Sequence, residues 1–253
     1  MESSARVSEL AATGKHDGAA GEAQRVAISR IALPDPEIEV WLARLDPDAA
    51  QVGNYLELLS AAELQRAERL RLERDRRRFV CARGILRVLL GRHLDIEPFA
   101  IGFAYTRNGK PLLADDPARL QFNLSHSGER ALYAISRTCT PGADIEYLNR
   151  DIDYTGMAGR FFTPRERAAL QRIPESGRER AFFACWTRKE AVIKAAGDGM
   201  SQPLDRFEVT LAPDAVPRLV DSGEAPQLAG HWDLYAPDVG NDYIAAIAAL
   251  RRG

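Results

Sequence analysis

The sequence predicts an α+β fold built from two similar halves, and two observations lead to that prediction. Two capping boxes, Ser60-Ala-Ala-Glu63 and Thr163-Pro-Arg-Glu166, lie 103 residues apart and mark two helix starts of the same kind. Each is followed by the same pattern of a long helix and then strands. We therefore expect two α/β halves, residues 37–140 and 141–251, related by a pseudo-twofold axis, with the active site in the cleft between them.

Short matches at an offset of 104 residues support this repeat. Phe79-Val-Cys resembles Phe183-Ala-Cys, and residues 101–106 resemble residues 205–210. Apolar strands over 131–135 and 243–247 close the two halves. The alternative is a chance similarity between common helix starts. Residues 1–36 precede the first half, are rich in Ala, Gly, Ser and charge, and are expected to form a disordered tail.

Composition excludes several classes of protein. The chain has 253 residues, of which 45% are hydrophobic and 28% charged, as in soluble globular proteins. Its net charge of −2 argues against a globally basic nucleic-acid binder. No apolar run approaches the ~20 residues that span a bilayer, so no membrane partner is expected. Three cysteines without CxxC spacing exclude a disulfide scaffold and favour a cytoplasmic location.

An acidic pair and a polar helix face indicate a site in the second half. Asp144 and Glu146 lie two apart on a predicted strand, so their carboxylates share one face. Oxygen ligands of this kind suit Mg²⁺, and an acidic edge strand facing solvent is the alternative. Glu190 and Lys194 are four apart on a predicted helix, one turn from Trp186. They are predicted to border a cleft, with a surface ion pair as the alternative.

Basic and small polar residues concentrate in the first half. Residues 63–92 contain ten Arg against four acidic residues, and arginine suits phosphate oxygens. Asn108-Gly-Lys110-Pro111 is a turn that presents a lysine. The segment Asn123-Leu-Ser-His-Ser-Gly128 places small donors beside a histidine, which fits an anion cradle. Because neighbouring strand residues diverge, Ser125 and His126 are a poor nucleophile–base pair.

Three segments together resemble the signature motifs of the surfactin-synthetase-activating type of 4′-phosphopantetheinyl transferase. They are residues 122–127, 142–146 and 186–194, in the family's order and spacing. Residues 108–111, 161–166 and 197–199 also fit, and the likeness covers about residues 38–250. Ala143 departs from the family, in which a larger aliphatic residue is usual, and this is expected to alter packing rather than chemistry.

The resemblance implies an enzyme that transfers the 4′-phosphopantetheine arm of coenzyme A to a serine of an apo acyl or peptidyl carrier protein, releasing 3′,5′-ADP. It implies that Asp144, Glu146 and Glu190 hold Mg²⁺, with Mn²⁺ also possible. Glu190 is the expected base, and Lys194 the group on the departing phosphate. The residues implied to bind coenzyme A are Arg66, Arg78, Lys110, Pro111, Ser125, His126 and Lys189, with Arg83 as a rival for Arg78. A monomer is expected.

Two other classes of function compete with this one. A degenerate relative could hold a nucleotide or a carrier domain without chemistry, but all three carboxylates and Lys194 are present. An Arg-rich nucleic-acid binder could use residues 63–92, although the chain lacks an aromatic-interleaved basic strand. Mg²⁺-dependent coenzyme A binding without transfer would favour the first alternative, and salt-dependent retention on DNA the second.

Overall fold

The computed structural model describes residues 28–46, 48–107, 109–115, 119–148, 151–197, 203–223, 228 and 230–251, and it has the α+β architecture expected from the sequence. The first half runs β1 (Ile28–Ile31), β2 (Ile38–Arg44), α2 (Ala49–Leu56), α3 (Ala61–Glu68), α4 (Glu73–Leu94), the 3₁₀ turn η1 (Pro98–Ala100), β3 (Phe103–Tyr105), β4 (Pro111–Leu113), β5 (Gln121–Ser127) and β6 (Arg130–Ser136). The second runs β7 (Cys139–Tyr147), α5 (Tyr154–Phe161), α6 (Pro164–Arg172), α7 (Glu175–Ala196), η3 (Leu204–Arg206), β8 (Glu208–Val209), β9 (Leu219–Asp221), β10 (Trp232–Tyr235) and β11 (Tyr243–Arg251).

The two halves repeat one order of elements. In the first, antiparallel strands are ordered β1-β2-β6-β5, and in the second β10-β11-β7, so β2-β6-β5 corresponds to β7-β11-β10. The long helices α4 and α7 have 22 residues each. Both predicted capping boxes are present, at Ser60–Glu63 and Thr163–Glu166. A pseudo-twofold axis stays a prediction.

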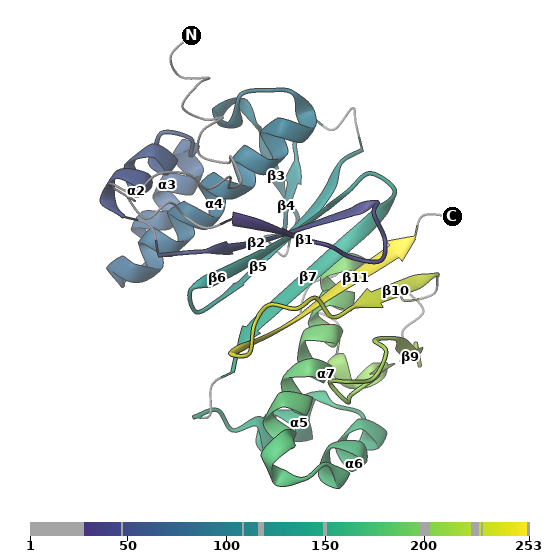
Figure 1. The fold of residues 1–253 in the computed structure, drawn as a ribbon. Coiled ribbons are helices and arrows are strands. Elements are labelled where there is room, and N and C mark those ends of the chain that lie inside the picture. The colour runs from purple at the N-terminus through teal and green to yellow at the C-terminus, as the bar shows by residue number, and fades with distance from the viewer. Residues whose placement is uncertain are drawn as a thin grey trace, which may run out of the picture.

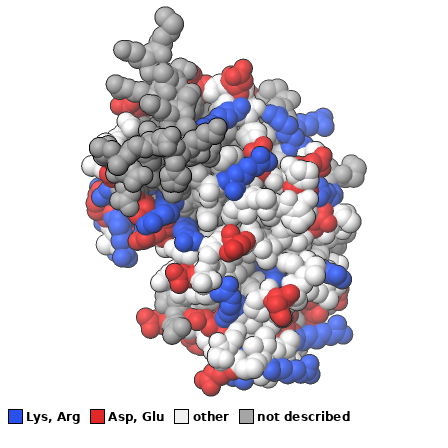
Figure 2. Space-filling model, in the orientation of Figure 1, with Lys and Arg blue, Asp and Glu red and all other residues white. Residues whose placement is uncertain are grey.

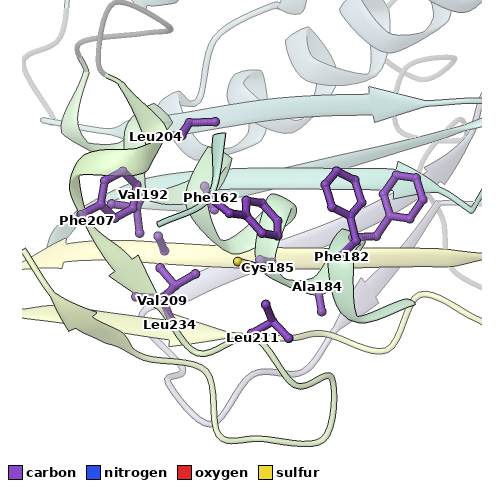
Figure 3. Close-up of a cluster of buried hydrophobic side chains, with 14 of the residues drawn as sticks. Phe162, Phe182, Ala184, Cys185, Val192, Leu204, Phe207, Val209, Leu211 and Leu234 are labelled. Carbon is purple, nitrogen blue, oxygen red and sulfur yellow. The ribbon is translucent and has the colours of Figure 1, made fainter. Parts of the chain in front are cut away.

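Helices cover the outer faces of two sheets that share a central core (Figure 1). Side chains alternate along each strand, so Val40 of β2 and Ile145 of β7 point into the central cluster. Residues on the opposite face of β2, such as Ala43, point toward the cluster that contains the buried side chains of α4. Figure 3 shows the cluster on the α7 side, to which Phe182 and Val192 of α7 and also Phe207 and Leu234 belong. Most side chains in the second half of α7 are buried, so close packing holds this helix against β7 and β11.

Two predicted boundaries need correction. Residues 28–31, assigned to the tail, form β1, which pairs with β2 from Ile28 opposite Ala43 to Ile31 opposite Val40. The turn between them is held by the backbone N–H of Glu37, which donates to Asp35. Residues 1–27 lie outside the described residues. The second half begins at Cys139 rather than at residue 141, because β7 starts there. No helix in the described ranges is long and apolar enough to cross a membrane.

Candidate functional site

A cavity of about 570 Å³ lies between the two halves, as the sequence predicts. The first half contributes α3, α4, the β3–β4 turn and β5, and the second contributes the C-terminal part of α7. Residues from both halves line it: Arg66, Phe79, Ala82, Arg83, Gly109, Lys110, Pro111, Phe122, Asn123, Leu124, His126, Glu190, Ile193, Lys194 and Gly197. Cationic side chains and one carboxylate therefore face a common space lined in part by apolar groups.

The guanidinium of Arg83 is held rigidly at the cavity wall. Its Nε donates to Oε1 of Glu63 at 2.7 Å, and an Nη donates to the Tyr105 hydroxyl at 3.1 Å. The group also lies over the Phe103 ring, 4.7 Å from its centre. Arg66 approaches from α3 and lies over Phe79. Because Glu63 and Tyr105 restrain it, Arg83 can meet an anion with little loss of side-chain freedom.

Lys110 joins the β3–β4 turn to the end of α7. Gly109 adopts a positive φ of 79°, and the backbone N–H of Lys110 donates to Thr106 Oγ1 at 3.1 Å. The Lys110 ammonium donates to the backbone carbonyl of Lys194 at 2.6 Å. Burial, together with the charge of Lys194, lowers the pKa of Lys110 to about 8. Asn108 of the predicted turn lies outside the described residues.

His126 lies on β5 among positive charges. Withdrawal from water, followed by the charges of Lys194, Arg78 and Arg66, lowers the pKa of its imidazole. The ring is therefore largely neutral near pH 7, and an anion bound in the cavity would favour its protonated form. His126 is thus placed to meet a negatively charged ligand.

The predicted acidic residues lie on β7 and α7, and Glu190 is the one of the three that lines the cavity. Asp144 is buried, and its Oδ1 accepts from the Lys194 ammonium at 2.5 Å and from the Ser125 hydroxyl at 2.9 Å. Ile145 points into the core between the sheets, as expected for a strand. Glu146 accepts from the Ser127 hydroxyl at 2.9 Å.

Asp144 influences both glutamates electrostatically. Burial, then the charge of Asp144, raises the pKa of Glu146 to about 7. The same two causes raise the pKa of Glu190, while Lys194 opposes the change. Like charges that share a desolvated site favour the protonated form unless a cation neutralises them. Glu146 and Glu190 each feel the charge of Asp144, in surroundings that favour a positive partner.

A metal ion fits this chemistry, although the side chains are not arranged as a finished site. Within the described ranges, no group of three His, Cys, Asp or Glu side chains is placed to hold a metal. Asp144 Oδ2 is nevertheless buried without a hydrogen-bond partner in the described structure, while Lys194 occupies Oδ1. A free buried carboxylate oxygen beside two carboxylates of raised pKa is the kind of donor that a divalent cation takes.

Three of the residues predicted to bind coenzyme A, namely Arg78, Ser125 and Lys189, do not line the cavity. Lys189 is fully buried, and its ammonium contacts Glu166 at 2.9 Å and the carbonyls of Leu204 and Phe207. It lies on the face of α7 that packs against η3 and α6, so its assignment as a coenzyme A contact is corrected to a structural role. Arg78 pairs with Glu129 at 3.2 Å instead.

Arg66, Lys110, Pro111, His126, Glu190 and Lys194 line the cavity, whereas Glu146 does not and accepts a hydrogen bond from Ser127. Ser125 and Asp144 both accept hydrogen bonds from the ammonium of Lys194, which lines the cavity. Arg83, which the sequence left as a rival for Arg78, lines the cavity. Asn123 and Phe79 line the cavity but were not predicted as site residues. For Asn123, the available signal was its place at the start of the polar motif at 123–128. Asn123 Oδ1 accepts from the backbone N–H of Ala143 at 3.0 Å, which ties β5 to β7.

The two halves also match two different family models. Residues 140–248 match the 4′-phosphopantetheinyl transferase superfamily, and residues 43–138 match the 4′-phosphopantetheinyl transferase N-terminal family. A 4′-phosphopantetheinyl transferase, HetI, of Nostoc sp. is 39% identical over 88% of this chain and 92% of its own. A 4′-phosphopantetheinyl transferase of Bacillus subtilis is 31% identical over 66% of this chain and 72% of its own.

Among solved structures, a chain described as “Chronobacterium ammoniagenes ACPS-CoA complex” resembles 46% of this chain and 98% of that chain, at 23% identity and a TM-score of 0.35. The fold and the cavity define an α+β protein of two halves, with cationic side chains and one carboxylate on the cleft between them. The family matches and the extent of the HetI alignment then show that the chain belongs to the 4′-phosphopantetheinyl transferase superfamily and is an enzyme of that class.

Proposed function

We propose that this enzyme transfers the 4′-phosphopantetheine arm of coenzyme A to a serine hydroxyl of an apo acyl or peptidyl carrier protein and releases 3′,5′-ADP. The observation that carries the proposal is the cavity, in which Arg66, Arg83, Lys110 and Lys194 face Glu190. Its cationic side suits the phosphates of coenzyme A, and its apolar lining suits an adenine ring. Family membership supports the reaction class.

Mg²⁺ is the proposed metal, with Asp144, Glu146 and Glu190 as the residues that would hold it. When bound, it would neutralise charge on the pyrophosphate. The unpartnered Asp144 Oδ2 and the raised pKa values of Glu146 and Glu190 support this donor set. In this structure the Lys194 ammonium supplies the positive charge beside Asp144.

The residues of the chain divide the reaction between them. The carrier serine oxygen attacks the β-phosphorus, and the bond from that phosphorus to the bridging oxygen breaks. Glu190, which faces the cavity, takes the serine proton. Lys194 lines the cavity and stabilises the negative charge on the departing ADP phosphate. Arg83, fixed by Glu63, binds a phosphate throughout.

Intact-mass measurement tests the proposal. Apo carrier proteins from fatty-acid, polyketide and peptide synthetases are incubated with the enzyme, coenzyme A and Mg²⁺, and a mass gain of one phosphopantetheine group is expected. Glu190→Gln is expected to fold, to bind coenzyme A by calorimetry and to lose about 10³-fold in transfer rate, within the range for a general base. Glu175→Gln, at the exposed start of the same helix, is the control. Full activity of Glu190→Gln would end the assignment.

The finer classification is also a proposal. We propose the surfactin-synthetase-activating type, a pseudo-twofold relation between the halves, a monomeric state and a cytoplasmic location. The repeated strand order supports the first three, because one chain already supplies both sides of the cleft. Three free, buried cysteines fit a reducing compartment.

A further inference from the structure

Polar side chains of β5 connect it to β7, although these strands belong to different sheets. Asn123, Ser125 and Ser127 alternate along β5 and each contacts β7. Asn123 accepts from a backbone N–H, Ser125 donates to Asp144, and Ser127 donates to Glu146. Two serines that are two residues apart therefore meet two carboxylates that are two residues apart.

The hydroxyl of Ser127 is fixed at both ends. Its Oγ accepts from the backbone N–H of Tyr147 at 3.1 Å and donates to Oε2 of Glu146 at 2.9 Å. Because the incoming N–H occupies a lone pair, the single hydroxyl proton points to the carboxylate. One oxygen of Glu146 is thereby held by β5, which restricts rotation of the carboxylate as a whole.

We propose that Ser127 is a positioning residue that orients the Glu146 carboxylate for a divalent cation. The inference rests on the proposed metal-dependent transfer and adds a residue that does not itself touch the substrate. Neighbours that hydrogen-bond a metal-ligating carboxylate typically change metal affinity by about 10- to 100-fold when removed. Ser127 does this from the first half of the chain, so the acidic site of the second half depends on both halves.

The test compares two side chains of equal size at position 127. Ser127→Thr retains the hydroxyl, whereas Ser127→Val replaces it with a methyl group, so a difference between them reports the hydrogen bond rather than packing. Mn²⁺ binding is titrated by electron paramagnetic resonance with no carrier protein present, and transfer rates are measured against Mg²⁺ concentration. Ser127→Ala is a third variant. Ser136→Ala, a buried serine of β6 that contacts Thr138 and Cys139, is the control.

We expect Ser127→Val and Ser127→Ala to bind Mn²⁺ at least about 10-fold more weakly than wild type, and Ser127→Thr within about threefold. The Mg²⁺ concentration for half-maximal rate rises in parallel, while the rate at saturating Mg²⁺ changes far less. Equal Mn²⁺ affinity of the Thr and Val variants overturns the inference, as does an equal loss in Ser136→Ala. If the Thr–Val difference holds but wild type modifies no carrier protein, the proposed function fails and this inference stands.

Discussion

The contact between β7 and α7 at Gly142 leaves no room for a side chain. A Cβ built there would lie 1.9 Å from the carbonyl oxygen of Ala191 and 2.6 Å from the backbone nitrogen of Ala195. Both are backbone atoms of α7, so no side-chain rotation relieves the clash. Reaching the 3.0 Å that real Cβ contacts respect requires a separation of about 1.1 Å between strand and helix.

Gly142→Ala is therefore expected to damage both stability and the site. Overpacking costs about 1–3 kcal/mol, and contact with two backbone atoms places this case near 3 kcal/mol. For a chain of this size that corresponds to a fall in Tm of about 6–12 °C. The displaced helix carries Lys194 and Glu190 away from Asp144, and a shift of about 1 Å can cost about 100-fold in rate.

Thermal unfolding by circular dichroism and the carrier-mass assay measure the two effects. The control is Gly159→Ala in α5, where a Cβ meets nothing within 4 Å. Alanine is the better helix former, so this variant should gain up to about 1 kcal/mol. The reasoning is refuted if Gly142→Ala melts within about 2 °C of wild type and transfers at the wild-type rate.

Three further predictions concern charged groups. Arg87 is 1% exposed and donates hydrogen bonds to Glu63 and to two backbone carbonyls, so Arg87→Ala should lower the free energy of unfolding, measured in urea, by about 3–5 kcal/mol. The control is Arg78→Ala, which should cost below about 1 kcal/mol because its partner Glu129 is exposed. Equal losses in the two variants would contradict the role given to Arg87. Burial alone would raise the pKa of Glu63, but hydrogen bonds from Arg87 and Ser60 and the arginine charges lower it. The contribution of Glu63 to stability is thus present above the unfolded pKa of about 4.5 and is lost as pH falls through the folded pKa. In Glu63→Gln, the free energy of unfolding measured in urea should therefore decline less steeply below about pH 5. Without metal, Glu146 has a pKa of about 7, above its value in the unfolded chain, so its protonated form stabilises the metal-free fold. This contribution is fully present below the unfolded pKa and is lost as pH rises through about 7. Mn²⁺ must displace its proton, so affinity should rise between about pH 6 and 8, and a pH dependence unchanged by Glu146→Gln would refute the assignment.

Local sequence rules predicted the helix starts and the acidic strand well. The capping boxes depend on residues three apart, and the facing of Asp144 and Glu146 depends on strand alternation, so neither needs tertiary information. The same rules missed β1, because pairing with β2 decides its structure and the segment lies beside a polar stretch. They also gave no sign that Glu63 would hold the two α4 arginines after serving as a cap residue.

Assignments within the site failed where helix rotation decides the outcome. Lys189 and Glu190 are neighbours in sequence, yet Lys189 points into the core and Glu190 into the cavity. The signal that could have placed Lys189 was Glu166, because its position in the capping box buries a carboxylate that needs a cationic partner. Arg78 and Arg83 lie on different faces of α4, and only the packing against Glu63 and Tyr105 shows which one borders the cavity.

The repeated scaffold explains why the acidic groups occupy only one of two similar places. Ser60 and Thr163 begin corresponding helices, and β2 and β7 hold corresponding places in the strand orders of the two halves. Trp41 and Ala43 pack in the core under α4, where the second half instead has carboxylates under α7. The first half therefore has apolar packing at this place, and its contribution to the cleft is cationic, from Arg66, Arg83 and Lys110. A charged ligand that needs both kinds of group can bind only where the two halves meet, so the division of residues between the halves, rather than the fold of either, determines the site.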